Sequence, residues 1–212
     1  MNKTVRWLLA LTALIPLLGV LSQPPDVNLL IYSLFVLVYL ARERLQPFIA
    51  GIPLSPLFKL FILIYVGGLL SESLVWWSNT ASGDIHQTGF YTDYGTHITS
   101  YFGFYLVVAL IWTVVLRFFR FTILQVFLTA GVLFGVVIEQ RGAILLAGLA
   151  SMPAGLVLWL YVALVYGSYP ALAYTLVYPE FEVYARRETV LKYPLVILLL
   201  WGVMFTIAVL SG

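Results

Sequence analysis

Long apolar runs recur along the whole chain, and they constrain the fold more than any other feature. Of the 212 residues, 62% are hydrophobic and 9% are charged, whereas a soluble domain carries roughly 25% charged residues. A helix needs about 20 mostly apolar residues to cross a bilayer, because each residue rises about 1.5 Å and the hydrocarbon is about 30 Å thick. The runs lack the period-two alternation of an outer-membrane barrel. We therefore predict an all-α fold, a polytopic integral membrane helix bundle in a single domain covering 1–212.

Seven spans result when each run is bounded by the prolines, glycines and charges that interrupt it. They cover about 7–21, 28–41, 57–77, 98–116, 121–138, 152–178 and 195–210. The apolar segment 143–150 is too short to cross alone, so we expect a re-entrant or interfacial segment, or an extension of the sixth span. Ser151, followed by Pro153, is the expected N-cap of that span. A signal peptide is the other interpretation of the first run, but the bulky Leu21 favours a retained span.

The distribution of lysine and arginine supports this layout independently, because cytoplasmic loops are enriched in both residues. With seven spans and a cytoplasmic N-terminus, ten of the eleven basic residues fall on the inner side, and Arg141 falls on the outer side. The inner residues are Lys3, Arg6, Arg42, Arg44, Lys59, Arg117, Arg120, Arg186, Arg187 and Lys192. We predict that the N-terminus is cytoplasmic and the C-terminus outside. The expected location is the plasma (inner) membrane of a prokaryote.

The longest polar segment of the chain, 71–97, carries both histidines, His86 and His97. Its second residue, Glu72, still belongs to the predicted third span, about five residues and so roughly 7–8 Å from the outer end. An acid at the centre of a membrane helix costs about 2.5–3.5 kcal/mol, and it normally faces protein or water and has a partner. Glu72 is therefore the first candidate site residue.

Small residues share a helix face with two glutamates. Gly68 lies four residues before Glu72, and Gly131, Gly135 and Glu139 follow one another at steps of four in the predicted fifth span. Positions four apart share a helix face, and small residues let membrane helices approach closely. We predict that the third and fifth spans contact a common interior. The alternative is that the glycines serve packing and the glutamates have structural or headgroup contacts.

The two glutamates are expected to share an outward-opening pocket, with Arg141 as their counter-ion. His97 begins the fourth span, and Tyr101 and Tyr105 follow it at four-residue steps, so this stripe is expected to line the same pocket. The candidate ligand-binding residues are Glu72, Glu139, Arg141, His97, Tyr101 and Trp76. Trp76 and its aromatic neighbours also fit an interfacial belt. Solvated interfacial positions are the expectation for both histidines, and the spacing of histidines and carboxylates indicates no metal site.

Three classes of function fit these features. The first is a non-enzymatic membrane protein, possibly of a transporter type, that binds or passes a small or lipidic ligand. The second is an integral membrane enzyme acting on a lipid or isoprenoid, with a glutamate as general acid and His97 as base. This class rests on a segment in which Glu72 is followed by GFYTDYG and by a span with Trp112, which is similar to the membrane carotenoid hydratases. The third is a structural or assembly subunit of a membrane complex.

Composition limits the partners and the chemistry. The chain has no cysteine, which removes thiolate catalysis and disulfides. The net charge of +2 gives no indication of a nucleic-acid partner. The expected partners are membrane lipids and the small or lipidic ligand, and no residue pattern indicates a cofactor or a particular protein partner.

Overall fold

The computed structural model describes residues 2–84, 91–184 and 186–210, with the side chains of 140, 141 and 203–210 outside the described set. The elements in chain order are α1 (Lys3–Thr12), α2 (Ile15–Val20), α3 (Leu30–Ala50), α4 (Pro56–Ser82), α5 (Tyr94–Ser100), α6 (Phe102–Phe118), α7 (Ile123–Leu128), the π-helix η2 (Thr129–Ile138), the 3-10 helix η3 (Glu139–Gly142), α8 (Ala143–Ala150), α9 (Gly155–Phe181) and α10 (Lys192–Leu210). No strand occurs in the described residues. The predicted all-α class is confirmed.

Several of these helices have the length and composition of membrane spans. Four described segments qualify: Lys3–Val20, Pro56–Ser82, Tyr94–Phe118 and Gly155–Phe181. A fifth is added if 123–138 and α8, which meet at a bend of 77°, form one broken span. The second half of α3 carries Arg42, Glu43 and Arg44, which makes it less apolar than these four. The apolar helices indicate a membrane-embedded protein.

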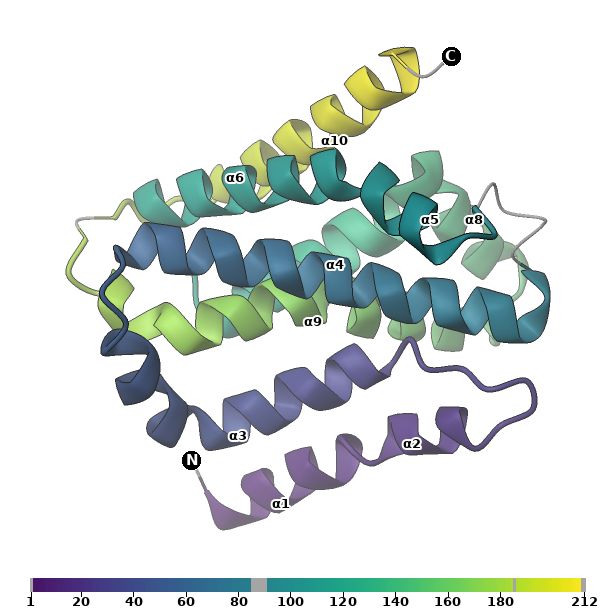
Figure 1. The fold of residues 1–212 in the computed structure, drawn as a ribbon, viewed down its shortest axis with the longest axis horizontal. Helices are drawn as coiled ribbons and strands as arrows, with labels where there is room; N and C mark the ends of the chain where they lie inside the picture. Colours follow the sequence, from purple (N-terminus) through teal and green to yellow (C-terminus); the bar gives the residue numbers. More distant parts are fainter. Residues whose placement is uncertain (1, 85–90, 185, 211–212) are drawn as a thin grey trace.

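Helix α9 is the centre of the bundle. It packs against α3, α4, α7, η2 and α8, and Figure 1 shows it running alongside α4, with α3 and α1 beyond. Nearly every residue from Val162 to Val177 is buried, so this part of the helix is enclosed on all sides rather than on one stripe. Pro170 lies inside this helix, which continues past it to Phe181.

The two ends of the bundle differ in charge. At one end α3, α6 and α9 finish and α4, α7 and α10 begin. There Nζ of Lys59 donates to Oε2 of Glu180 at 2.8 Å, and Phe119 forms an isolated bridge with Arg187. We call this the basic end, because it gathers Lys59, Arg117, Arg120, Arg186, Arg187 and Lys192. At the opposite end the Tyr161 hydroxyl donates to Oδ2 of Asp26 at 2.8 Å, which ties α9 to the turn before α3.

Several helices differ in extent from the predicted spans. Helix α3 continues to Ala50, and α4 continues to Ser82. The N-cap expected at Ser151 is wrong: α9 begins at Gly155, and the Ser151 hydroxyl donates to the carbonyl of Ala147 in α8. The segment 143–150 forms the separate helix α8. Gly148 and Gly155 lack the Cβ atoms that would block its close contact with α9.

Candidate functional site

Glu72 lies deep within α4. The helix begins after Ser55, whose Oγ accepts from the Phe58 amide at 3.3 Å, and ends at Gly83, which takes a positive φ of 79°. Since α4 reaches Ser82, Glu72 lies ten residues before the end of the helix, or roughly 15 Å along its axis. This is deeper than the predicted 7–8 Å. The residue is 7% exposed, so its carboxyl group depends on protein partners.

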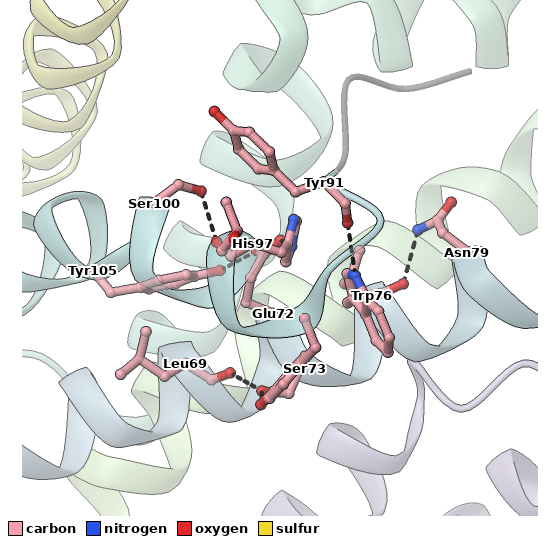
Figure 2. Close-up of polar contacts among 12 residues, drawn as sticks. Leu69, Glu72, Ser73, Trp76, Asn79, Tyr91, His97, Ser100 and Tyr105 are labelled. Carbon is pink, nitrogen blue, oxygen red and sulfur yellow. Dashed lines mark hydrogen bonds and ion pairs between the residues drawn. The ribbon is translucent and has the colours of Figure 1, made fainter. Parts of the chain in front are cut away.

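Both oxygens of Glu72 are held by side chains from the next two helices. Oε1 lies 2.9 Å from Nε2 of His97 in α5, and Oε2 accepts from the Tyr105 hydroxyl of α6 at 2.9 Å. Figure 2 shows the three side chains pointing toward one another from α4, α5 and α6. His97 is 0% exposed, so the expectation of a solvated interfacial histidine is wrong for this residue. His86 lies outside the described residues.

The short helix α5 positions His97. It is capped by Asp93, whose Oδ2 accepts from the Thr96 amide at 2.7 Å. This hydrogen bond to the charged carboxylate lowers the pKa of Asp93. The Ser100 hydroxyl donates to the His97 carbonyl at 2.6 Å, and Tyr101 then separates α5 from α6. The cap and the tight C-terminal turn together hold the imidazole over Glu72.

Gly68 makes room for Tyr105. A Cβ at position 68 would overlap the Tyr105 ring at Cδ1 and Cε1. The ring therefore lies against the backbone of α4, one helical turn before Glu72, and its hydroxyl reaches the carboxylate. The predicted shared face of Gly68 and Glu72 is confirmed, and the face it contacts belongs to α6.

The other glycines bring α4 and η2 against the same partner. A Cβ on Gly67 would lie 3.4 Å from Cβ of Tyr169 in α9. A Cβ on Gly131 of η2 would overlap the backbone of Ala163 in α9. A Cβ on Gly135 would meet Tyr166, one turn further along α9. The common neighbour of the two glycine faces is thus α9.

Glu139 and Glu72 both lie within electrostatic reach of the same three tyrosines. Glu139 is half-buried at the junction of η2 and η3. Tyr101, Tyr166 and Tyr169 are each within electrostatic reach of both carboxylates. Tyr101 also lies beside His97, with the ring centroids 4.9 Å apart. Three phenols therefore lie near both acids, which belong to different helices.

Trp76 and Arg141 are the two remaining candidate residues. Trp76 is half-buried, and its Nε1 donates to the Tyr91 carbonyl at 3.0 Å while its ring meets Tyr94 edge-on at 5.1 Å. Trp76 therefore holds the entry into α5 rather than the carboxylate (Figure 2). Arg141 has its backbone in η3, but its side chain is outside the described set, and its role as counter-ion stays a prediction.

The site contains residues beyond the six candidates chosen from the sequence. Tyr105 was marked by its four-residue step from Tyr101, and it proves to be a direct partner of Glu72. Tyr166 and Tyr169 were missed, because they come from α9 and nothing in the sequence marks Tyr166 as a neighbour of η2 or Tyr169 as a neighbour of α4. No group of three or more histidine and carboxylate side chains suited to a metal ion occurs within the described residues.

The Glu72–His97–Tyr105 cluster can hold a proton in more than one arrangement. The Tyr105 hydroxyl donates to one carboxyl oxygen, while Nε2 of a histidine donates or accepts according to its tautomer and charge. The shared proton can therefore reside on the carboxyl or on the imidazole without the loss of the hydrogen bond. Comparisons with protein-family models, curated proteins and solved structures give no match to this chain.

Proposed function

We propose that this chain is a multi-pass membrane protein that binds a small or lipidic ligand at the end of the bundle opposite the basic end. The ligand would lie among the tyrosines between Glu72 and Glu139. Its binding would move the proton shared by Glu72 and His97, as in a transporter. The proposal includes about seven spans, a cytoplasmic N-terminus, an outer C-terminus and a location in the plasma membrane of a prokaryote.

One observation carries the proposal. Glu72 is an acid that is 7% exposed in the interior of a helix of membrane-span length, and its partners are a fully buried histidine and a tyrosine. An ionisable group at membrane depth is costly and typically marks a ligand or proton pathway. A structural hydrogen bond alone needs neither an acid nor a titratable partner, since a serine or an amide can supply it.

The proposed orientation is supported by the gathering of basic side chains at one end. Loops rich in lysine and arginine remain on the cytoplasmic side, and the contact between Phe119 and Arg187 brings two such loops together. The site lies toward the other end, beyond the middle of α4, so the proposed pocket opens outward.

The test is the identification of bound molecules. The wild type and the variants Glu72→Gln and Glu182→Gln are purified in mild detergent, and small molecules and metals that co-purify are identified by mass spectrometry. Glu182 is exposed, so its variant makes the same chemical change outside the site. A stoichiometric ligand in the wild type and in Glu182→Gln, lost in Glu72→Gln, supports the proposal. Identical spectra with bulk lipid alone contradict it and favour a structural subunit.

A second candidate function is a membrane enzyme acting on a lipid or isoprenoid. The hydrogen bond between Glu72 and His97 favours it, because both groups can give or take a proton, and proton transfer by positioned side chains is the basis of general acid–base catalysis. The two functions predict different amounts of product over time. An enzyme accumulates product beyond one equivalent per protein, and Glu72→Gln abolishes this, whereas a binding protein returns its ligand unchanged.

A further inference from the structure

A second feature lies away from the Glu72 site. An apolar groove of about 350 Å³ runs between α1, α3, α7 and α9. Its lining includes Leu9, Tyr32, Phe35, Tyr39, Ile123 and Phe127. From Tyr32 to Tyr39 the groove follows α3 for seven residues, or roughly 10 Å. In Figure 1, α1 and α3 lie side by side at one edge of the bundle.

Two arginines contact α3 at Tyr39 and Leu40, next to the end of this groove that Tyr39 lines. The Arg42 guanidinium lies over the ring of Tyr39, with Cζ 4.1 Å from the centroid, and donates to the Tyr39 carbonyl at 2.8 Å. Arg6 extends from α1 toward the same part of α3, where it donates to the Leu40 carbonyl at 3.5 Å. Leu9, three residues after Arg6, lines the groove itself. Both cations therefore lie at the same level of the groove.

No carboxylate among the described residues pairs with either arginine. In the ranges that the structure describes, the ion pairs of lysine and arginine join Lys59 with Glu180 and Lys192 with Glu188. Neither Arg6 nor Arg42 has a carboxylate partner among them. Each guanidinium keeps N–H donors beyond its bond to a carbonyl, and the fork geometry of a guanidinium matches a phosphate.

We propose that this groove holds the acyl chain of an anionic phospholipid whose phosphate binds Arg6 and Arg42. The apolar walls suit a hydrocarbon chain, and the two cations next to one end suit a negative headgroup at the membrane surface. Basic side chains at the surface of a membrane attract anionic lipids by about 1 kcal/mol each, which is roughly fivefold in affinity. Two arginines thus give an expected preference of roughly 25-fold over a zwitterionic lipid.

The absence of cysteine from the chain allows a clean test. Leu124 lines the groove and is 64% exposed, so Leu124→Cys carries a fluorescent label at the groove. The full chain is reconstituted in phosphatidylcholine vesicles. The label is then quenched with equal mole fractions of brominated phosphatidylglycerol or brominated phosphatidylcholine. A label at Val66→Cys, on an exposed part of α4, is the control for general contact with lipid.

The proposal predicts stronger quenching by the brominated anionic lipid at Leu124→Cys and equal quenching by the two lipids at Val66→Cys. The preference is lost when Arg6→Gln and Arg42→Gln are added, and it survives Arg44→Gln, which removes an exposed neighbouring cation. Equal quenching by both lipids at the groove overturns the proposal, as does a preference that survives the double replacement. Size-exclusion profiles that match the wild type establish that each variant is folded.

Discussion

The carboxylate of Glu72 lies 2.9 Å from Nε2 of His97, although 25 residues separate them. The contact joins the interior of α4 to the short helix α5, and Tyr105 of α6 completes it on the other carboxyl oxygen. Because both groups are buried, the loss of either one leaves the other with little access to solvent as a substitute partner.

Replacing Glu72 is expected to destabilise the protein strongly. The Glu72→Ala variant leaves His97 and the Tyr105 hydroxyl without their buried partner, and breaking a buried pair costs about 3–5 kcal/mol. Glu72→Gln keeps the shape and some hydrogen bonds, so it is expected to cost less. Unfolding in mixed micelles measures both, with Glu182→Gln as the control that stays near the wild type. An equal loss in Glu72→Ala and Glu182→Gln contradicts the account.

Two glycines give a matched comparison on the packing of Tyr105. At Gly68 an added Cβ overlaps the Tyr105 ring, whereas at Gly103, also in a helix, nothing lies within 4 Å. Gly68→Ala is therefore expected to displace the ring from Glu72 at a cost of about 1–3 kcal/mol. Gly103→Ala is expected to be neutral or to stabilise by up to about 1 kcal/mol, since alanine favours the helix. Thermal unfolding measures the stability of both variants. A Gly68→Ala variant that is more stable than Gly103→Ala contradicts the described contact of Tyr105 with α4.

The N-cap of α5 is expected to make the site sensitive to acid. The pKa of Asp93 is lowered in the folded protein by its hydrogen bonds from Thr96. The stability that the Asp93 carboxylate contributes is therefore fully present above its unfolded pKa of about 3.9. It is lost as the pH falls through the pKa of the folded protein. Hydrogen exchange of the amides in 94–100 should accelerate over that range.

The substitutions at Asp93 separate charge from capping. Asparagine is also a good N-cap residue. Asp93→Asn should therefore keep the amides of 94–100 protected from exchange, and this protection should no longer depend on pH. Asp93→Ala should lose the protection at every pH. Protection in Asp93→Ala equal to that of the wild type would show that the cap does not hold His97.

Helical periodicity explains what the sequence could predict. The step of four residues from Gly68 to Glu72 is a property of a single helix, and this face is found in α4. The steps from His97 to Tyr105 were predicted on one helix but cross the junction of α5 and α6 at Tyr101. The apolar runs likewise identify the helices, because the bilayer demands their length.

The remaining features depend on contacts between helices. The fold of 91–100 over Glu72 depends on the Asp93 cap and on the contact of Trp76 with Tyr91 and Tyr94, which no periodicity encodes. The same holds for Tyr169, which approaches from α9. The π-helix η2 was not predicted either, since its sequence has the composition of an ordinary apolar helix.

The most direct test of the central claim is an infrared difference spectrum of the purified protein before and after its ligand is stripped by exhaustive detergent exchange at constant pH. The account predicts a change in the C=O stretching band of a protonated carboxyl group in the wild type and in Glu182→Gln. The band should be missing in Glu72→Gln. A spectrum in which no carboxyl band attributable to Glu72 changes would contradict the proposal that ligand binding moves the proton between Glu72 and His97.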